Sequence, residues 1–509
     1  MSNLRPRHTA SVGLAELAHL LGVDGPGTGP QVSGVTLDSR AVLPGDLYAA
    51  LPGANVHGGR FAGGAQALGA VAVLTDADGA ALAAAAGVSV PVLVVADPRA
   101  ALGPAAALIY ANRPPGLTLI GVTGTNGKTT TAYLLDSALR ALGQRVGLVG
   151  TVETRIGEHR VKSVRTTPEA SEVHALIAAM REAGVATCVM EVSSHALSLH
   201  RVDGLVYDVA IFTNLSQDHL DHHKTMENYF LAKASLFTPE RARQGVVCVD
   251  DGWGQRLARE AGIPVTTVSS TAAAADWQIE AEPGAAEFTL TGPEHRLALR
   301  SALPGDFNRV NTALAAIALL VAGHDVAAVR SAVLADPHVP GRMEKVTPTQ
   351  AHAGAPLAVV DYAHTPDAVA AALAALRPLA APGALVIVLG AGGDRDPGKR
   401  VAMGAAAASG ADIVVITDDN PRSEDPATIR AALLAGALDA GGAAQVHEIP
   451  DRRAAIEAAV AAAVMAGPGA VLAVVGKGHE TGQDIGGVIH PFEDRAEVER
   501  ALDRALGRR

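Results

Sequence analysis

The fold is decided by residues 117–143, which read LTLIGVTGTNGKTTTAYLLDSALRALG. An apolar strand-like run leads into a glycine-rich turn and then into a helical segment, which is the opening unit of an α/β sheet. Similar apolar runs follow at ATCVMEV, VAIFTNL and GVVCVD, with helical segments between them. This alternation predicts a central domain built on a P-loop-type, mainly parallel sheet.

The flanking segments predict two further α/β domains. Residues 1–113 hold the short strand-like pieces VSGVTLDSR, GDLYAAL, AVAVLTD and VPVLVVAD, and Pro114-Pro115-Gly116 marks a boundary. A second boundary falls at Pro340-Gly341, after which LAVVDYAH, ALVIVLGAGG, DIVVITDDN and AVLAVVGKG each lead into or alternate with a helix. We therefore expect domains at 1–113, 114–340 and 341–509, the last a Rossmann-like doubly wound sheet.

Composition narrows the function. The chain has 509 residues, with 41 Lys and Arg against 52 Asp and Glu, giving a formal charge of −11. Binding to nucleic acid or to an anionic membrane is therefore not expected to be the main function of this protein. No apolar run approaches the ~20 residues that span a bilayer, so no membrane insertion is expected. Cys188 and Cys248 lie inside apolar runs, as small core residues do in a reducing cytoplasm.

The glycine-rich turn resembles a phosphate-binding P-loop. A strict G-x-x-x-x-G-K-[ST] would place glycine at Val122, whereas the actual spacing is Gly124-x-x-Gly127-Lys128-Thr129. The physical requirements are nevertheless met. Glycines let backbone N–H groups surround phosphate oxygens, the helix N-terminus favours an anion, and Lys128 supplies positive charge. The alternative is a glycine-rich turn without a ligand.

Two residues after neighbouring strands suggest a metal. Glu191 ends the run CVME, and His219 lies in NLSQDHLDHH just after the next strand. Each taken alone fits a helix cap or a surface residue. Together with Thr129 they suit one or two Mg²⁺ ions around a γ-phosphate.

A last strand end poses a specificity question. ITDDNPRSED, residues 416–425, follows an apolar run and contains ordinary turn chemistry, since Asx side chains bond their own backbone and Pro fixes φ. Ligands of doubly wound sheets, however, collect at the carboxyl ends of strands. The stretch is thus either a turn or a binding site.

Ordered motifs along the chain resemble the Mur ligase family. They are GTNGKTT, TTPEA, MEVSSH, TNLSQDHLD, AKASLF, GDFNRVNTALA, GRME, DYAHTPD and GGDRDPGKR, and the resemblance extends from DSRAVLPGDLYAAL to GKGHE. It implies an ATP-dependent amide ligase of peptidoglycan precursor synthesis. ATP would phosphorylate a carboxylate of UDP-N-acetylmuramoyl-L-alanyl-D-glutamate, and the amine of diaminopimelate would displace phosphate from the acyl phosphate. The resemblance also implies a monomeric cytoplasmic enzyme.

The same resemblance assigns roles at the reaction centre. Lys233, by itself an ordinary helix lysine, would be carbamylated and so become an oxygen ligand for a second Mg²⁺. The implied catalytic residues are Lys128, Glu191, His219 and Lys233, and the implied metal ligands are Thr129, Glu191, His219 and Lys233. The implied ATP contacts are Gly124, Thr125, Asn126, Gly127, Lys128, Thr129, Thr130, Asn308, Arg342 and Asp361.

Substrate contacts follow in the same way. Ser39 would meet the uridine end, and the phosphate, sugar and peptide parts would contact Thr166, Thr167, Ser193 and Arg201. Many relatives carry glutamine two residues before this arginine, where this chain has Leu199. The implied diaminopimelate contacts are Arg395, Asp419, Asn420, Pro421, Arg422, Gly476 and Glu480. A guanidinium fork at Arg422 suits the second carboxylate that distinguishes diaminopimelate from lysine.

Three other functions compete with this one. One is a ligase that adds lysine or another diamino acid, and Arg422 argues against it. A P-loop kinase or nucleotide switch would act without an amino-acid cosubstrate. Folylpolyglutamate synthase shares the central architecture, but the leading DSR and PGDL segment and the DNPR turn favour the muramoyl ligase.

Overall fold

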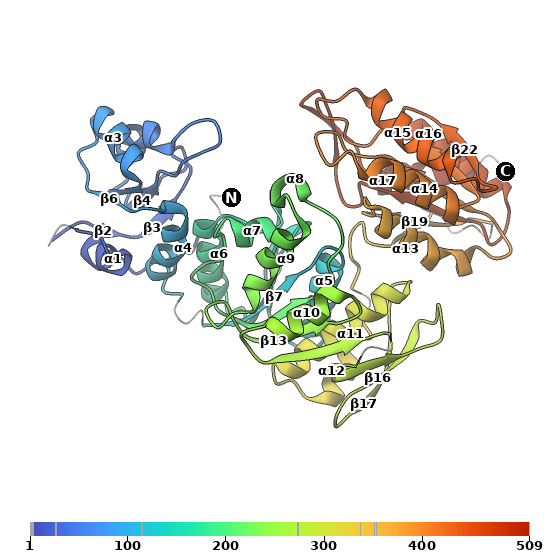
Figure 1. The fold of residues 1–509 in the computed structure, drawn as a ribbon, viewed down its shortest axis with the longest axis horizontal. Helices are drawn as coiled ribbons and strands as arrows, with labels where there is room; N and C mark the ends of the chain where they lie inside the picture. The colour runs from blue at the N-terminus through green and yellow to red at the C-terminus, as the bar shows by residue number, and fades with distance from the viewer. Residues whose placement is uncertain are drawn as a thin grey trace.

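The computed structural model describes residues 5–25, 28–112, 116–271, 274–335, 337–350, 352 and 354–507. Figure 1 shows three successive lobes along the chain, coloured blue, green to yellow, and orange. All three are α/β, as the sequence predicts. The predicted boundary at Pro114 and Pro115 lies outside the described residues.

The first lobe is a four-stranded parallel sheet with helices around it. Its strands follow the chain in the order β3 (Gly34–Thr36), β4 (Asp46–Ala49), β5 (Ala72–Thr75) and β6 (Val92–Val94). The helices are α1 (Leu14–Leu21), η2 (Gly58–Phe61), α2 (Ala62–Ala67), α3 (Ala77–Ala85) and α4 (Pro98–Ile109). A small antiparallel pair, β1 (Val12–Gly13) and β2 (Gln31–Val32), lies beside them. All four predicted strands are confirmed.

The central lobe contains an 11-stranded sheet in the order β10-β9-β8-β11-β7-β12-β13-β14-β15-β16-β17. Its parallel middle is β8 (Val146–Val149), β11 (Thr187–Glu191), β7 (Thr118–Thr123), β12 (Tyr207–Phe212), β13 (Ala242–Cys248), β14 (Val265–Ser269) and β15 (Trp277–Glu280). Antiparallel strands extend both edges, namely β9 (Glu153–Ile156), β10 (His159–Lys162), β16 (Glu287–Thr291) and β17 (Arg296–Arg300). The sequence patterns indicated the parallel middle but not these extensions.

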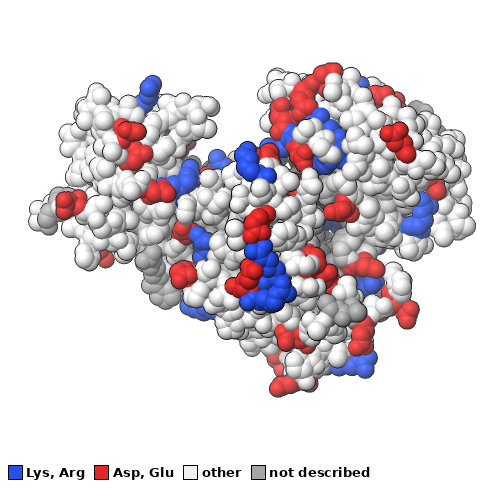
Figure 2. Space-filling model, in the orientation of Figure 1, with Lys and Arg blue, Asp and Glu red and all other residues white. Residues whose placement is uncertain are grey.

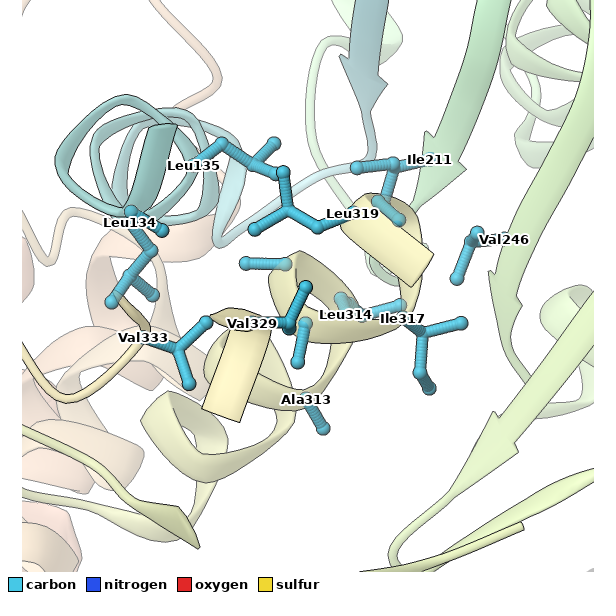
Figure 3. Close-up of a cluster of buried hydrophobic side chains, with 14 of the residues drawn as sticks. Leu134, Leu135, Ile211, Val246, Ala313, Leu314, Ile317, Leu319, Val329 and Val333 are labelled. Carbon is cyan, nitrogen blue, oxygen red and sulfur yellow. The ribbon is translucent and has the colours of Figure 1, made fainter. Parts of the chain in front are cut away.

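Helices cover the central sheet and enclose its core. They are α5 (Lys128–Ala141), α6 (Ala170–Glu182), α7 (Ser194–Ser198), α8 (Leu220–His223), α9 (Met226–Ala234), η3 (Ser235–Phe237), α10 (Gly252–Glu260), α11 (Asp306–Val321) and α12 (Val326–Ala332). Figure 3 shows side chains of α11 lying between Ile211 of β12 and Val246 of β13 on one side and side chains of α5 and α12 on the other. This buried layer fixes the N-terminus of α5, and therefore the glycine-rich turn, above the carboxyl ends of the strands.

The third lobe is a six-stranded sheet in the order β18-β19-β23-β20-β21-β22. The strands are β18 (Glu344–Val346), β19 (Leu357–Asp361), β20 (Leu385–Leu389), β21 (Ile413–Ile416), β22 (Gln445–Glu448) and β23 (Val471–Val475), and only β18 is antiparallel. The helices are α13 (Pro366–Leu376), η4 (Arg377–Ala380), α14 (Lys399–Gly410), α15 (Pro426–Asp439), α16 (Arg452–Met465) and α17 (Asp494–Gly507). A hairpin of β24 (Gly482–Ile485) and β25 (Val488–Pro491) follows β23.

Surface charge and the cysteines agree with the composition. Figure 2 shows acidic and basic groups scattered over one face, with large uncharged areas between them. Cys188 and Cys248 are free and buried, as predicted, and burial raises the pKa of the Cys188 thiol to about 12. Among the described residues, no helix is long and apolar enough to cross a membrane.

Candidate active site

The glycine-rich turn joins β7 to the N-terminus of α5, as its sequence predicts. Gly127 is the residue before the helix and has φ of +87°, a conformation that a side chain would strain. Gly127 also packs closely against Asn311, so that a Cβ added to Gly127 would lie only 2.5 Å from Asn311 Oδ1. The ammonium of Lys128 folds back and donates to the carbonyls of Gly124 at 2.9 Å and Thr125 at 2.8 Å. Lysine charge and helix N-terminus therefore face the same space, which suits a phosphate.

Glu191 is held beside this loop at the end of β11. Its side chain is buried, and Oε2 accepts hydrogen bonds from Thr129 Oγ1 at 2.9 Å and Thr151 Oγ1 at 3.0 Å. The backbone N–H of Thr151 donates to Oε1 at 2.8 Å. The predicted ligands Thr129 and Glu191 are thus in direct contact. Thr151, which the sequence analysis did not single out, orients the carboxylate.

Lys233 and His219 approach the loop from the other side. Lys233 is fully buried on α9, donates to the Gly124 carbonyl at 2.7 Å and lies 4.6 Å from the centre of the Tyr229 ring. Burial lowers the pKa of Lys233 well below its ordinary value, and the nearby Lys128 charge adds to this effect. Burial also lowers the pKa of His219 to about 3. The His219 imidazole is therefore neutral at pH 7, and burial favours the neutral form of the Lys233 amine.

These residues line one cavity of about 660 Å³ between the central and third lobes. Its lining includes the predicted residues Thr125, Asn126, Gly127, Lys128, Thr129, Thr130, Thr166, Glu191, Ser193, His219, Lys233, Asn308, Arg342 and Asp361. Gly124 lies directly beneath, in contact with both lysines. The structure thus brings together almost the whole predicted ATP and metal set.

The far wall of this cavity is built by the third lobe. The Arg342 guanidinium stacks 4.2 Å from the centre of the Tyr362 ring and reaches Thr129 Oγ1 at 3.4 Å. The carboxylate of Asp361 accepts the backbone N–H groups of Met343 at 2.7 Å and Ala363 at 2.8 Å. Burial raises the pKa of Asp361. Asn308, from α11, donates to the Pro304 carbonyl at 2.7 Å and accepts from Asn311 at 3.1 Å.

A second cavity, of about 730 Å³, lies between the first and central lobes. Ser39 lines it, together with Arg99, Arg165 and Glu169. Arg201 is paired with Glu169 at 3.0 Å and lies 3.4 Å from the Thr167 carbonyl.

Two hydroxyls lead from this second cavity to Glu191. Thr167 Oγ1 donates to the Glu191 carbonyl at 2.8 Å and lies 3.3 Å from Ser193 Oγ. Thr166 Oγ1 lies 3.0 Å from Thr151 Oγ1. Contacts through Arg201, Thr167 and Ser193 therefore link Glu169, in the wall of the Ser39 cavity, to the wall of the phosphate cavity, which Thr166 and Ser193 line.

The DNPR turn lies away from both cavities, in the third lobe. Arg422 has φ of +51°, and its backbone pairs with β24 through Arg422 N to Asp484 O at 3.0 Å. The guanidinium donates to the Gly393 carbonyl at 2.6 Å. A Cβ on Gly392 would lie 3.0 Å from the Arg422 guanidinium and 3.9 Å from the Arg395 side chain. The two predicted arginines therefore flank the same backbone segment.

The remaining predicted residues, Gly476 and Glu480, lie in the loop after β23 and contact the DNPR turn. Gly476 has φ of +110°, and a Cβ there would lie 2.5 Å from Asp419 Oδ2. Asn420 Nδ2 donates to Glu480 Oε2 at 2.8 Å. Pro421 is buried in the turn, with its carbonyl accepting from Glu424 N–H at 3.0 Å. The stretch that began as either a turn or a site is a turn whose side chains converge on a second loop.

One loop connects this cluster to the phosphate cavity. In GKGHE, Glu480 faces Asn420, while the His479 ring lies 5.4 Å from the Tyr362 ring. Burial lowers the pKa of His479 to about 3, and the Thr151 backbone and Arg342 lie around it. Lys162 of β10 also donates to Thr481 Oγ1. The sequence analysis did not single out His479 or Lys477, the other two polar residues of GKGHE. The charged residues between its glycines were the signal that could have indicated them.

Comparisons with known proteins agree with this geometry. Three family models match the chain: "Mur ligase family, catalytic domain" at residues 31–110, "Mur ligase middle domain" at 122–320 and "Mur ligase, glutamate ligase domain" at 341–498. A UDP-N-acetylmuramoyl-L-alanyl-D-glutamate--2,6-diaminopimelate ligase of Streptomyces avermitilis is 53% identical, over 99% of each chain. The chain belongs to the Mur ligase family.

Other Mur ligase relatives give the same placement. The UDP-N-acetylmuramyl-tripeptide synthetase of Leifsonia xyli is 50% identical, over 99% of this chain and 98% of the relative. A solved UDP-N-acetylmuramoyl-L-alanyl-D-glutamate--2,6-diaminopimelate ligase is 33% identical and has a TM-score of 0.67, with 97% of this chain and 99% of that chain covered. The folylpolyglutamate synthase of Mycobacterium tuberculosis has a TM-score of 0.58 at 22% identity, over 74% of this chain and 92% of that chain, and shares the fold.

Proposed function

We propose that this Mur ligase joins diaminopimelate to UDP-N-acetylmuramoyl-L-alanyl-D-glutamate in peptidoglycan precursor synthesis, at the expense of ATP. The observation that carries the proposal is the GKGHE loop. It contacts the DNPR turn through Glu480 and the surroundings of Glu191 through His479. An amino acid bound at the turn would therefore have its amine directed toward the phosphate cavity. The names of the relatives at 53% and 50% identity support the same reaction.

The chemistry requires two displacements. A carboxylate oxygen of the UDP-linked dipeptide attacks the γ-phosphorus of ATP, the P–O bond to ADP breaks, and an acyl phosphate forms. The amine of the amino acid then attacks the acyl carbon, phosphate leaves, and the amine loses a proton. Lys128 and the N-terminus of α5 offset charge that develops on the transferred phosphoryl group. Thr166, Thr167, Ser193 and Arg201 would orient the UDP substrate from the Ser39 cavity.

Magnesium fits the donor set beside the phosphate loop. Thr129 and Glu191 offer a hydroxyl and a carboxylate in mutual contact, the hard oxygen ligands that Mg²⁺ prefers. Within the described ranges, no three His, Cys, Asp or Glu side chains form a metal site by themselves. The remaining ligands would come from His219, a modified Lys233 and phosphate oxygens. When bound, Mg²⁺ would screen the approach of the carboxylate to the γ-phosphate.

The burial of Lys233 favours its carbamylation. Only an unprotonated amine attacks CO₂, and burial lowers the pKa of Lys233 well below its ordinary value. In that step the N–C bond forms, one proton is lost, and the lysine becomes a carbamate anion. Such a group would supply oxygen ligands where the ammonium of an ordinary lysine would repel a cation.

The proposal extends to organisation in the cell and along the chain. We take domains 1–113, 114–340 and 341–509 to bind the UDP substrate, ATP and the amino acid, respectively. The three family matches support this division. The enzyme would act as a cytoplasmic monomer, consistent with two free buried cysteines. Light scattering on the purified protein tests the monomer.

A product assay tests the function. The purified protein is incubated with ATP, Mg²⁺ and UDP-N-acetylmuramoyl-L-alanyl-D-glutamate, with diaminopimelate and lysine both present, and the tripeptide products are resolved by mass. We expect the diaminopimelate product and ADP formation that requires the UDP substrate. A dominant lysine product would assign another amino acid to the DNPR turn. ADP formation without any amide product would favour a kinase or nucleotide switch.

A further inference from the structure

Lys477 is a fully buried cation near the predicted amino-acid site, and no role follows for it from the chemistry above. It lies between Gly476 and Gly478, directly after β23, and its side chain is 0% exposed. A lysine rarely loses all its water unless other groups replace that water. Its partners therefore say what it is there to hold.

All three partners of Lys477 are predicted contacts of the amino acid. The ammonium donates to Asn420 Oδ1 at 3.0 Å and to Glu480 Oε2 at 3.2 Å. It also lies 3.8 Å from Asp419 Oδ1. Two of the three ammonium donors are therefore used in hydrogen bonds, and the Asp419 carboxylate adds an ion pair. Lys477 thus lies beneath the predicted amino-acid site and contacts Asp419, Asn420 and Glu480.

The ammonium also fixes which way the Asn420 amide faces. Asn420 Oδ1 accepts from Lys477 and from the backbone N–H of Asp484 at 2.9 Å, while Nδ2 donates to Glu480 Oε2 at 2.8 Å. The reversed amide would place NH₂ against two donors, which cannot pair with it. Both contacts to Glu480 fall on Oε2. Among the described residues Oε1 has no hydrogen-bond partner, and it is left for a ligand.

Charge balance gives the same picture. Asp419 and Glu480 bring two carboxylates, and Lys477 offsets one of them. The neighbouring buried Arg452 is paired with Asp494 at 2.7 Å, so this pair adds no net charge, although the Arg452 guanidinium also attracts Asp419 and Glu480. One net negative charge remains, which suits a single ammonium group on the ligand. Without Lys477 the two carboxylates would repel each other across the turn.

We propose that Lys477 is a positioning residue of the amino-acid site, which holds Asn420 and Glu480 so that they receive the distal ammonium of a diamino acid. This inference rests on the proposed function. It separates two kinds of recognition within the site. Arg422 and Arg395 face the carboxylate end of the amino acid, whereas Lys477 acts on the ammonium end through other side chains.

The test is steady-state ligation with ATP and the UDP substrate saturating and diaminopimelate varied. Lys477→Met keeps the length of the side chain and removes its charge. We expect KM for diaminopimelate to rise about tenfold to a hundredfold, with KM for ATP and the UDP substrate changed by less than about twofold. Lys477→Arg should recover part of the loss, because it restores charge with a different shape. Lys345→Met, at the exposed residue of β18, is the matched control and should change none of these constants.

A second arm separates positioning from general stability. Glu480→Gln alone should raise KM for diaminopimelate, and adding Lys477→Met to it should raise KM little further, because both changes disable the same ligand contact. The double variant also restores charge balance, so it should fold even if Lys477→Met does not. Fully multiplicative effects, or a Lys477→Met enzyme that is less heat-stable but has unchanged KM, would overturn the inference. A wild-type protein that makes no diaminopimelate product would instead refute the proposed function.

Discussion

At the scale of single residues, Lys233 is buried beside the phosphate loop, and this burial lowers the pKa of its amine. If its carbamate is a metal ligand, Lys233→Ala should abolish ligation and leave binding of the UDP substrate measurable, because Ser39 and Arg201 lie on other elements. Mass spectrometry under native conditions should find the added mass of one CO₂ on the intact wild-type protein and not on Lys233→Ala. Lys224→Ala, an exposed lysine just before α9, is the matched control. Full activity of Lys233→Ala would assign this lysine to packing.

Arg422 tests recognition of the amino acid at the same scale. Its guanidinium lies beside Gly392 and Gly393 together with Arg395. Arg422→Ala should cost roughly 1.5–3 kcal/mol, or about tenfold to a hundredfold in kcat/KM for diaminopimelate, as expected for a charge-assisted pair. Arg422→Lys should recover only part, since an ammonium cannot form the planar fork.

The measurement for Arg422 is competition between diaminopimelate and lysine, with both products resolved by mass. Lysine use should change little, so the preference must shrink. Arg504→Ala, on the outer helix α17, serves as the control. An unchanged product ratio in Arg422→Ala would return the DNPR stretch to an ordinary turn.

At the scale of elements, the strand–turn–helix unit β7–α5 depends on glycine at its sharpest point. Gly127→Ala would place a Cβ 2.5 Å from Asn311 Oδ1 at φ of +87°. We expect KM for ATP to rise at least about tenfold, because a shift of the loop moves the backbone donors that hold phosphate. Gly143→Ala at the other end of α5 is the matched control, since it has φ of +78° but open space.

Both glycine variants should lose about 1 kcal/mol of stability from left-handed strain, measured by denaturant unfolding. Only Gly127→Ala should weaken the binding of ATP. If the two variants have equal KM values for ATP, the turn tolerates a side chain and does not enclose the phosphate tightly.

At the scale of the whole molecule, buried histidines predict sensitivity to acid. His223 is buried against Tyr229 and bonds Ser194 Oγ at 2.9 Å, and burial lowers its pKa to about 4. The unfolded chain binds this proton near pH 6.5, so stability is complete above that pH and falls between about pH 6.5 and pH 4. The melting temperature should therefore drop over this range.

Variants at two histidines attribute that drop. His223→Gln should melt lower than wild type at neutral pH but lose less stability on acidification, because one titrating group is gone. His295→Gln, an exposed position in the loop between β16 and β17, should follow the wild-type profile. Identical pH profiles for wild type and His223→Gln would show that this buried imidazole does not control acid unfolding.

The sequence by itself determined the three α/β lobes and most of the predicted residues that line the phosphate cavity. It did so because the deciding signals are local: an apolar strand, a glycine turn and a helix lie within residues 117–143, and polar residues follow each strand directly. Parallel strands then bring those ends to one edge, so Glu191, Lys128 and His219 reach one cavity without further information. The family resemblance added Lys233, Asn308 and Arg342, which no local pattern distinguishes from ordinary helix or surface residues.

Only the tertiary structure decided which side chains orient the others. Thr151 holds Glu191 from 40 positions away, Lys233 reaches the Gly124 carbonyl across 109, and Lys477 reaches Asn420 across 57. Such partners are chosen by sheet order and by the angle at which lobes meet, and neither leaves a periodic trace in the chain. The same holds for the antiparallel edges of the central sheet. Polar residues that follow a strand can be recognised in the sequence. The burial and the hydrogen-bond partners of a single threonine or lysine depend instead on how the whole chain packs.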